Sequence, residues 1–379
     1  MQTINYGNSL LSLTASVMRY YSVPTSHDTL PAADHLLAGA PRNVVLMLFD
    51  GMGMNLLKTH LTEDAFLKKH LYAEIQSVFP PTTTAATTTM ETGLSPIEHG
   101  WLGWNLKFSE PDAVVNLYPN TVAQSQGQKA APYHVARRYL PFTTIFEKIA
   151  AAAADGDAVC AECISPYSAY EAKTVDALEE TVIRLCREDG RHYLYTYHNQ
   201  PDYDIHDLGT AHETVAAHVR AVNALAERLY ASLPEDTLVM ITADHGLTDT
   251  TWRSLYAYPE ITDCLACPPS VETRAMSLFV KQGMHGRFAE AFNEHFGDIY
   301  TLIPHKDVMA MQLFGPGDAH PMAESFIGDF LAVARTAVSI DPAPVPDPHP
   351  FLGSHGGMTA AETEIPLIAF FGGENRGRT

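Results

Sequence analysis

The chain has 379 residues, of which 46% are hydrophobic and 18% charged, so it can bury a sizeable core and is neither disordered nor fibrous. Its 44 acidic residues outnumber 24 basic ones, and the net charge of −20 argues against general nucleic-acid binding and against an anionic membrane as partner. An anionic substrate would therefore need local positive charge, for which bound metal ions are one source.

The first 21 residues favour an amphipathic helix over a secretory signal. They hold no basic residue before Arg19, and Ser12, Thr14 and Ser16 interrupt their apolar stretch. No run in the chain approaches the ~20 apolar residues that a membrane span needs. We therefore expect a cytoplasmic protein with no membrane partner.

Five cysteines are an odd number, which argues weakly against a disulfide framework. Cys160/Cys163 and Cys264/Cys267 form two C-x-x-C pairs, and a four-thiolate zinc site is one interpretation of them. The pairs lie about a hundred residues apart, whereas zinc ribbons separate them by ~15–20 residues. We favour the alternative that the first pair belongs to a buried strand, where a free cysteine is a small apolar side chain.

An alternation of strands and helices starts at residue 43. Residues 43–50 (NVVLMLFD) form an apolar run that ends in a carboxylate, and Gly51 and Gly53 precede a helical pattern over 55–71. This order is typical of a buried parallel strand that passes into a helix.

The same alternation continues towards the C-terminus. A capping box of Thr144 and Glu147 predicts one helix, and a second box of Thr210 and Glu213 predicts a long one. Apolar runs and periodicity predict further strands at 158–165, 192–197, 237–244 and 365–372, and a helix over 175–185.

Strands that alternate with helices predict an α/β fold, with a mostly parallel central sheet and helices on both of its faces. We expect residues 1–379 to form a single α/β catalytic domain. Residues 100–140 and roughly 250–350 depart from the alternation, and we expect them to be insertions that form a cap subdomain over the site. In such sheets, sites lie beyond the carboxyl ends of the strands.

Three carboxylates and three imidazoles stand near the ends of these predicted strands. They are Asp50, Asp202, His206, Asp244, His245 and His355. If the sheet is as predicted, all six gather along one edge of it. Oxygen and nitrogen ligands suit borderline cations such as zinc, and six of them make two three-ligand sites that leave positions open for substrate.

Each residue taken alone also has a simpler interpretation. A strand-end aspartate such as Asp50 is more often a turn or cap residue, and any one of 18 histidines is more often a surface or core residue than a ligand. Residues 202–207 could equally be a polar loop. The metal hypothesis therefore depends on the joint pattern.

The segment SVFPPTTTAATTTMETG (77–93) offers a nucleophile. In isolation it could equally be a low-complexity threonine patch. Its context favours function, because a strand expected to end at Phe79 is followed by two turn-forming prolines and a possible helix start. A hydroxyl at a helix N-terminus lies near free N–H groups, and an adjacent metal ion can hold it as an alkoxide.

Taken together, these residues resemble the alkaline phosphatase superfamily, and within it the type I phosphodiesterase/nucleotide pyrophosphatase branch. The motifs LFDG, FPPTT leading to TGLSPIEHG, PDYDIHDLG, ADHG and GSHGG occur in the family's order. Any one of them is a weak signal, whereas the ordered set is highly specific.

The resemblance implies a role for each motif residue. In the family's F-P-x-x-T pattern the fifth position is the nucleophile, which here is Thr83. It also implies two divalent metal ions, zinc in most relatives and manganese in some. The implied ligand sets are Asp202, His206 and His355 for one ion, and Asp50, Asp244 and His245, close to Thr83, for the other.

Some positions depart from the family's pattern. Many diesterases of this branch carry Asn three positions after the nucleophile, in contact with a phosphoryl oxygen, and this chain has Ala86 there. Asn105 is a candidate replacement for that contact. The sulfatase signature C-x-P-x-R is absent, which argues against sulfate-ester cleavage by a modified cysteine.

Two further pairs are candidates for substrate contacts. Trp101 and Trp104 could stack on a base or an aromatic leaving group, with ordinary packing as the alternative. Arg274 and Lys281 could meet a second anionic group, or simply belong to a solvated edge.

We therefore expect a metal-dependent hydrolase of small-molecule phosphate esters, in the first place a phosphodiesterase or nucleotide pyrophosphatase. A phosphomonoesterase, a phosphonate hydrolase or a phosphoryl-transferring mutase on the same scaffold is the alternative. A non-catalytic metal- or ligand-binding module is an alternative of another class. Such a module would lack a ligand or the nucleophile, and none is missing here.

Overall fold

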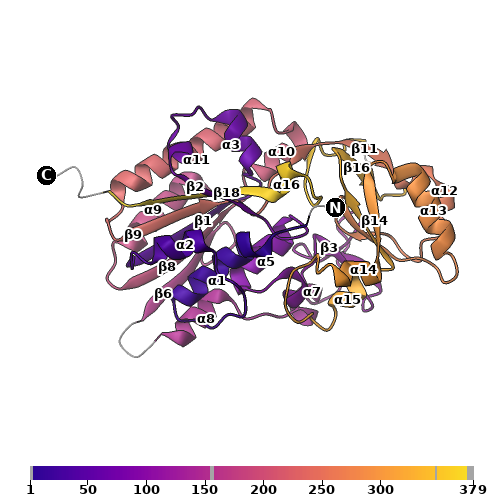
Figure 1. Cartoon of the computed structure of the whole chain (residues 1–379), viewed down its shortest axis with the longest axis horizontal. Helices are drawn as coiled ribbons and strands as arrows, with labels where there is room; N and C mark the ends of the chain where they lie inside the picture. Colours follow the sequence, from indigo (N-terminus) through magenta and orange to yellow (C-terminus); the bar gives the residue numbers. More distant parts are fainter. Residues whose placement is uncertain (1–2, 154–157, 346–347, 374–379) are drawn as a thin grey trace.

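The structure is a computed structural model that describes residues 3–153, 158–345 and 348–373. Its largest elements are two seven-stranded sheets with helices around them (Figure 1). The central sheet comprises, in spatial order, β2 (Leu71–Gln76), β18 (Glu364–Phe371), β9 (Thr237–Thr242), β1 (Asn43–Phe49), β8 (Arg191–His198), β6 (Val159–Ser165) and β7 (Tyr170–Glu171).

Most of the central sheet is parallel, as predicted. Strands β9, β1, β8, β6 and β7 pair in parallel, whereas β18 runs antiparallel to both of its neighbours, β9 and β2. Strand β1 is buried along its whole length, which explains why its sequence is apolar on both faces.

Helices cover both faces of this sheet (Figure 1). One side carries α1 (Leu10–Tyr20), α2 (Pro31–Leu37), α5 (Thr83–Thr92) and α8 (Ile145–Ala152). The other carries α3 (Met54–His60), α4 (Phe66–Lys69), α9 (Val175–Cys186) and α11 (Glu213–Ser232). Helices α9 and α11 share a side because both connect parallel strands in the same direction across the sheet, and such crossovers keep one hand.

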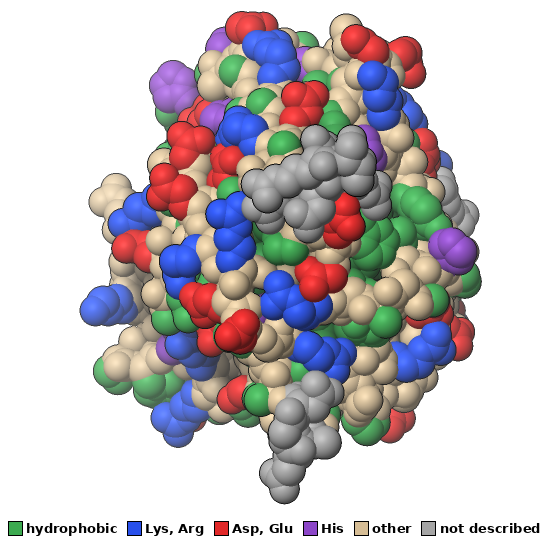
Figure 2. Space-filling model, turned by 90° about the vertical axis from the view of Figure 1, so that its left-hand side faces the viewer, with side chains coloured by type: hydrophobic (Ala, Val, Ile, Leu, Met, Phe, Trp, Pro, Cys, Tyr) green, Lys and Arg blue, Asp and Glu red, His purple; other side chains and the backbone are tan. Residues whose placement is uncertain are grey.

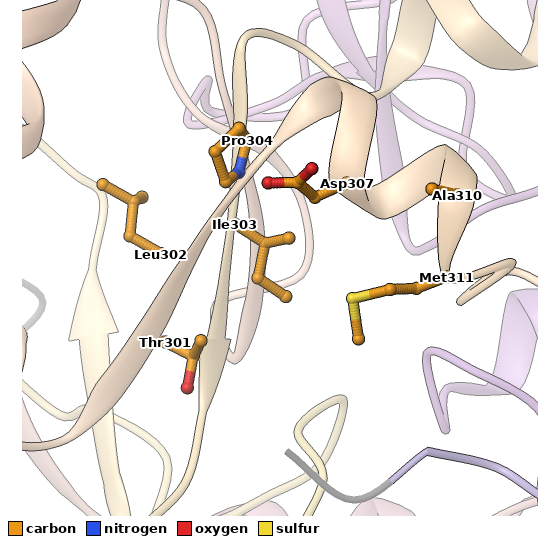
Figure 3. Close-up of a pocket in the computed structure, with 7 residues that line it drawn as sticks. All are labelled: Thr301, Leu302, Ile303, Pro304, Asp307, Ala310 and Met311. Atoms are coloured by element: carbon orange, nitrogen blue, oxygen red, sulfur yellow. The ribbon is translucent and has the colours of Figure 1, made fainter.

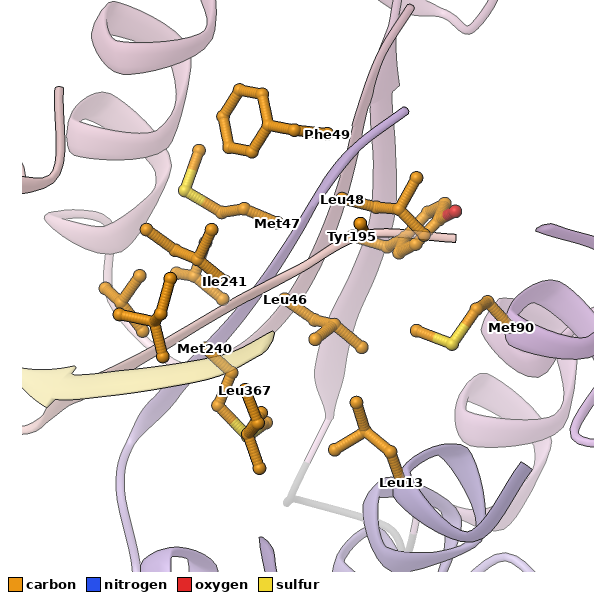
Figure 4. Close-up of a cluster of buried hydrophobic side chains, with 14 of the residues drawn as sticks. Leu13, Leu46, Met47, Leu48, Phe49, Met90, Tyr195, Met240, Ile241 and Leu367 are labelled. Carbon is orange, nitrogen blue, oxygen red and sulfur yellow. The ribbon is translucent and has the colours of Figure 1, made fainter. Parts of the chain in front are cut away.

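The core between sheet and helices follows the alternation of side chains along the strands. In Figure 4, Leu46 and Leu48 of β1 lie on the side of Leu13 and Met90, whereas Met47 and Phe49 point the other way. The side chains of Leu13 and Met90 come from α1 and α5, so the helix that begins at Thr83 is anchored in the core.

Several predicted elements differ from those observed. The helical pattern over 55–71 is split into α3 and α4. The strand expected to end at Phe79 ends at Gln76. The capping box at Thr210 is wrong, because His212 caps α11 and its side chain accepts a hydrogen bond from the backbone N–H of Thr214. The box of Thr144 and Glu147 is confirmed at the start of α8.

The predicted first helix forms as α1, and it is buried on nearly all sides rather than on one face alone. Its hydroxyl groups are tolerated because they bond to backbone carbonyls: Thr14 donates to Leu10 and Ser16 to Leu30.

The second sheet draws its strands from both segments that depart from the alternation. In spatial order it comprises β14 (Tyr300–Pro304), β15 (Phe330–Ala334), β13 (Ala275–Leu278), β12 (Ser270–Val271), β3 (Asn105–Phe108), β4 (Ala113–Asn116) and β5 (Thr121–Val122). The pairing of β12 with β3 joins strands that lie far apart in the sequence. That the two segments act as a cap stays a prediction.

The remaining elements are short or lie beside the second sheet. They are η1 (Tyr6–Asn8), α6 (Pro96–His99), α7 (Val135–Tyr139), α10 (Asp202–Leu208), β10 (Thr248–Asp249), β11 (Thr251–Ser254), η2 (Leu255–Ala257), α12 (Pro259–Thr262), α13 (His285–Phe296), α14 (His305–Ala310), α15 (Ala323–Phe326), β16 (Val338–Asp341), β17 (Gly353–Ser354) and α16 (Ala360–Thr363).

Acidic and basic side chains are interspersed on the face seen in Figure 2, and no basic patch forms there. Within the described ranges, none of the helices is both long and apolar enough to cross a bilayer.

Candidate active site

The six predicted ligand residues lie at one edge of the central sheet. Asp50 follows β1 directly, and Asp244 and His245 follow β9. Asp202 begins α10 just after β8, and its backbone N–H donates to the carbonyl of Asp50. His355 precedes β18, and it reaches the same edge because that strand runs antiparallel to the others.

Two motif glycines permit this crowding. Gly51 has a φ of +73°, and a Cβ there would lie 2.5 Å from Leu247 Cδ1 and 2.9 Å from Asp202 Cβ. At Gly246 a Cβ would meet the Ala361 carbonyl oxygen at 2.2 Å. The glycines of LFDG and ADHG are therefore needed for loops that pass very close to one another.

The first candidate metal-ligand group consists of Asp50, Asp244 and His245, whose ligand atoms all lie within 4.8 Å of one another. His245 Nε2 is 3.5 Å from Asp50 Oδ1 and 3.5 Å from Asp244 Oδ2. The other oxygen of Asp244 accepts hydrogen bonds from the backbone N–H groups of Gly51 and His245. All three side chains are buried.

The second group lies beside the first and contains Asp202, His355 and again His245. His355 Nε2 is 3.9 Å from Asp202 Oδ1, and its ring stacks on that of His245 at a centroid distance of 3.9 Å. His206, the expected third ligand, has its Nε2 3.3 Å from Asp202 Oδ2. It is thus close to Asp202, although the most compact group takes His245 in its place.

Each of the three imidazoles is oriented by a backbone carbonyl. The Nδ1 atoms lie 2.8 Å from the Gly353 oxygen for His206, 3.1 Å from the Gly246 oxygen for His245, and 3.1 Å from the Pro81 oxygen for His355. Because a carbonyl oxygen can only accept, each Nδ1 carries a proton and donates it. This leaves Nε2 as the ring atom that can bind a cation, which is the usual arrangement around metal-binding histidines.

The carboxylates fit a cation as well. Asp50 Oδ1, Asp202 Oδ1 and Asp244 Oδ2 are buried without a hydrogen-bond partner among the described residues. Buried charged oxygens without partners are costly, and metal coordination is one of the ways in which proteins satisfy them. The donor set of carboxylate oxygens and imidazole nitrogens therefore suits zinc or manganese.

The electrostatics of the site reflect this crowding of charge. Burial, together with the charges of Asp244 and Asp202, raises the pKa of Asp50 well above its ordinary value. Burial acts in the same direction on Asp202, but His206 outweighs it and lowers the pKa of that carboxyl. Burial lowers the pKa of His206, yet Asp202 raises it to about 9, so a metal ion would have to displace a proton there.

Thr83 is the first residue of α5 and faces the first group. Its Oγ1 is 3.4 Å from Asp50 Oδ2 and 3.3 Å from His245 Nε2, and the side chain is 8% exposed. The neighbouring threonines point elsewhere: Thr82 donates to Glu272, and the Thr84 hydroxyl is buried without a partner among the described residues. Ala86 is part of the hydrophobic core.

Two residues of the site were not anticipated from the sequence. The Tyr197 hydroxyl donates to Asp50 Oδ2 at 2.5 Å. Glu272 accepts from the Thr82 hydroxyl at 2.6 Å and from the backbone N–H of Trp104 at 2.7 Å, and burial raises its pKa to about 7. Tyr197 lies near the end of β8, so its position in the sequence could have indicated a place in the site. Glu272 reaches the site from the second sheet, and no sequence pattern indicated this.

A pocket of about 770 Å³ opens beside Thr83, Asp50 and Asp202. Aromatic side chains form much of its wall, and Trp104, Tyr118, Tyr167 and Tyr203 are exposed at it. Trp101 lines the same pocket but is otherwise buried in the core of the second sheet. Both tryptophans are therefore placed where a ligand could reach them.

The other candidates for substrate contacts are placed less favourably. Asn105, in β3, is not among the residues that line the pocket, and its Oδ1 is buried without a partner among the described residues. Arg274 is wholly buried in a two-bond ion pair with Glu362, so the expectation that it meets a second anionic group is wrong. Lys281 donates to the Asp263 carbonyl.

The zinc-thiolate alternative finds no support in the described part of the chain. All five cysteines are free, and the candidate metal-ligand groups found there contain no cysteine. A smaller hollow of about 410 Å³, between β14 and α14, shares no residue with the site (Figure 3). Asp307 is its one titratable lining residue.

Comparisons with known proteins agree with these motifs. The family model described as type I phosphodiesterase/nucleotide pyrophosphatase matches residues 44–358. No curated protein matches the chain in sequence. Human ectonucleotide pyrophosphatase/phosphodiesterase 5 is similar in structure, with a TM-score of 0.62 and 18% identity over 86% of this chain and 87% of that one.

Two further solved structures share the fold. Murine ectonucleotide pyrophosphatase/phosphodiesterase 5 has a TM-score of 0.60 and 16% identity over 86% of this chain and 87% of its own. Phosphonoacetate hydrolase from Sinorhizobium meliloti 1021 has a TM-score of 0.63 and 15% identity over 87% of this chain and 90% of its own. The family match spans most of the chain, and the protein therefore belongs to the type I phosphodiesterase/nucleotide pyrophosphatase family of the alkaline phosphatase superfamily.

Proposed function

We propose that this protein hydrolyses phosphate esters through attack of the Thr83 hydroxyl on phosphorus, with phosphodiesters or nucleotide pyrophosphates as its substrates. The observation that carries the proposal is the position of Thr83 Oγ1, within 3.4 Å of Asp50 and 3.3 Å of His245 at the edge of the large pocket. Family membership supports the reaction class. The murine relative, solved with AMP as an inactive Thr-to-Ala variant, supports a threonine nucleophile and a nucleotide-like substrate.

Two divalent cations, zinc or manganese, belong to this proposal. Their ligands would be Asp50, Asp244 and His245 for one ion, and Asp202, His206 and His355 for the other. When bound, such ions supply Lewis-acid charge and favour the ionised form of a nearby hydroxyl. The unpaired carboxylate oxygens and the carbonyl-bound imidazoles support this assignment.

The protein's own groups have distinct roles in the reaction. The Thr83 oxygen forms a bond to phosphorus as the bond to the leaving oxygen breaks, and its proton is lost to water. Water then cleaves the phospho-threonine and restores the hydroxyl. Tyr197 holds the Asp50 carboxylate in place. The N–H groups in the first turn of α5, which have no partners within the helix, stabilise the phosphoryl oxygens.

The test is the release of p-nitrophenolate from bis-p-nitrophenyl phosphate, with zinc or manganese added. Thr83→Ala should lower kcat by at least about a thousandfold, as expected for loss of a nucleophile. Thr83→Ser keeps the hydroxyl and should retain measurable turnover. Thr84→Ala is the matched control, because that side chain has no hydrogen-bond partner among the described residues and should change kcat little. Undiminished activity in Thr83→Ala would overturn the nucleophile assignment.

A panel of substrates separates the alternatives. Faster turnover of p-nitrophenyl phosphate than of the diester would favour a phosphomonoesterase, and turnover of phosphonoacetate would favour a phosphonate hydrolase. Lack of activity on every member, with no divalent metal bound after its addition, would favour a non-catalytic module.

A further inference from the structure

One face of α5 carries a line of polar side chains from the nucleophile into the pocket. Thr83, Thr87 and Glu91 are spaced four residues apart, so they lie on the same face of the helix, and all three line the pocket. The Thr87 hydroxyl is already engaged, since it donates to the Thr83 carbonyl at 2.6 Å and contacts the Tyr118 hydroxyl at 2.7 Å. Glu91 is the member of this line that remains available to a ligand.

Glu91 is a partly buried carboxylate that makes no hydrogen bond and no ion pair with any residue in the described ranges. Burial raises its pKa to about 7, which reflects the cost of removing its charge from water. An unpaired carboxylate that faces a pocket is a recognition group for a cation or for a strong hydrogen-bond donor.

The aromatic wall of the pocket that Glu91 lines favours an organic cation over a polar donor. Trp101, Trp104, Tyr118 and Phe142 line the pocket, and their rings lie close together: Trp101 is 5.8 Å from Tyr118 and 5.9 Å from Phe142 between centroids. Aromatic faces attract ammonium groups, and most strongly so when water is excluded. The polar atoms of two of these rings are already engaged, because Trp101 Nε1 donates to the Leu140 carbonyl and the Tyr118 hydroxyl contacts that of Thr87.

Arg137 is the group that could otherwise neutralise Glu91. It lines the pocket from α7, it is exposed, and it lowers the pKa of Glu91 at a distance, but it forms no ion pair with it or with any other described residue. A ligand cation would therefore compete with Arg137 for Glu91, and removal of Arg137 should help that ligand. This competition distinguishes ligand recognition from a purely internal charge pair.

We propose that Glu91 and the surrounding aromatic side chains form a subsite for an amine or quaternary ammonium group carried by the substrate. The subsite rests on the proposed phosphodiesterase function, because Thr83 would attack the phosphorus of the same molecule. Eight residues of helix separate Thr83 from Glu91, a rise of ~12 Å, and a glutamate side chain leans back towards the helix N-terminus. A short arm of a few atoms between phosphorus and nitrogen would therefore span the two.

The experiment compares two p-nitrophenyl phosphodiesters that differ only in charge. p-Nitrophenyl phosphocholine carries the quaternary ammonium, and p-nitrophenyl 3,3-dimethylbutyl phosphate has a neutral carbon in its place. We expect the ratio of kcat/KM for the cationic over the neutral ester to exceed about 10 in the wild type, a tenfold preference being modest for a desolvated ammonium contact. Glu91→Gln should lower this ratio about tenfold, and Arg137→Gln should raise it.

Glu227→Gln, an exposed position on α11, is the matched control and should leave the ratio as it is. Thermal unfolding of each variant excludes misfolding as the cause of a change. If Glu91 has only a structural role, Glu91→Gln lowers Tm, whereas a ligand-binding carboxylate that is costly to bury leaves Tm equal or higher. A ratio unchanged by Glu91→Gln, or lowered equally by Arg137→Gln, overturns the subsite.

Binding can be measured independently of chemistry. Calorimetric titration of the metal-loaded protein with phosphocholine and with 3,3-dimethylbutyl phosphate should show a Kd about tenfold lower for phosphocholine, and Glu91→Gln should remove that difference. Equal Kd values contradict the subsite even if both esters are hydrolysed. Conversely, a Glu91-dependent difference in Kd without turnover of either ester keeps the subsite and rejects the proposed hydrolysis.

Discussion

Glu91 ionises near neutral pH because its surroundings oppose its charge. Burial is the main cause of its raised pKa of about 7, and Arg137 opposes the rise. The other titratable groups that feel its charge are Tyr118, Cys163, Tyr193 and Tyr195, whose own pKa values are all raised, so they are neutral at pH 7. Arg137 is thus the charged partner that modulates Glu91 in the free protein.

The pH dependence of cation binding follows from this pKa. A raised carboxyl pKa means that the ionised form appears only as pH rises through about 7, so about a tenth of Glu91 is ionised at pH 6 and about nine tenths at pH 8. KM for p-nitrophenyl phosphocholine should therefore fall by up to about tenfold from pH 6 to pH 8, relative to KM for the neutral ester. Glu91→Gln should abolish this relative change, and a relative KM that rises with pH would contradict the assignment.

At the scale of single residues, the sequence predicted the position of a candidate ligand when that residue directly follows a predicted strand. Asp50 and Asp244 follow apolar runs, and their placement could be predicted because parallel strands deliver their carboxyl ends to one edge. Glu91 could not be identified in this way, because it looks like any helical glutamate and its lack of a partner is a property of the folded pocket. Glu272 likewise depends on a contact between two sheets.

Among the elements, a buried ion pair connects the second sheet to a loop of the candidate metal site. Arg274 precedes β13, and its guanidinium donates two hydrogen bonds to Glu362 of α16, at 2.6 and 2.8 Å. Glu362 also accepts from the N–H of Gly357, two residues after His355. The pair therefore holds the His355 loop against the second sheet, which explains why an arginine is fully buried there.

Removal of one partner of this buried ion pair should destabilise the protein. Glu362→Ala leaves the Arg274 charge buried without its counter-ion and removes the acceptor for Gly357, so the free energy of unfolding should fall by about 3–5 kcal/mol. Urea denaturation measures this change. Glu188→Ala is the matched control, because it breaks an exposed ion pair with Arg184 at the C-terminal end of α9 and should cost under about 1 kcal/mol. Equal losses in the two variants would contradict the structural role of the buried pair.

At the scale of elements, local sequence patterns predicted where helices and strands occur better than they predicted the direction of a strand or its pairing partner. The capping box of Thr144 and Glu147 and the apolar run of β1 are encoded by neighbouring residues, and both are confirmed. The antiparallel direction of β18 is not encoded locally, because a run of apolar residues is compatible with either strand direction. The pairing of β12 with β3 arises between segments far apart in sequence, and no local pattern encodes it.

For the whole molecule, the site concentrates negative charge in a protein that is already acidic. The net charge is −20, and three carboxylates with unpaired oxygens meet at one edge of the central sheet. Without a cation, their mutual repulsion opposes folding, because the unfolded chain separates them and returns them to water. A cation that binds only the folded chain should therefore stabilise the entire structure.

Thermal unfolding with and without metal tests this coupling. Zinc or manganese at about 100 times its Kd should add about 2.7 kcal/mol of stability, which for a chain of this size raises Tm by about 3–5 °C. Asp244→Asn removes one ligand and one repulsive charge, so the metal-free Tm should stay equal or rise while the metal-induced increase shrinks. Asp64→Asn, at an exposed position, should keep the full increase. An equal increase in Asp244→Asn would mean that the group of Asp50, Asp244 and His245 does not couple metal binding to folding, since Asp244 belongs to that group alone.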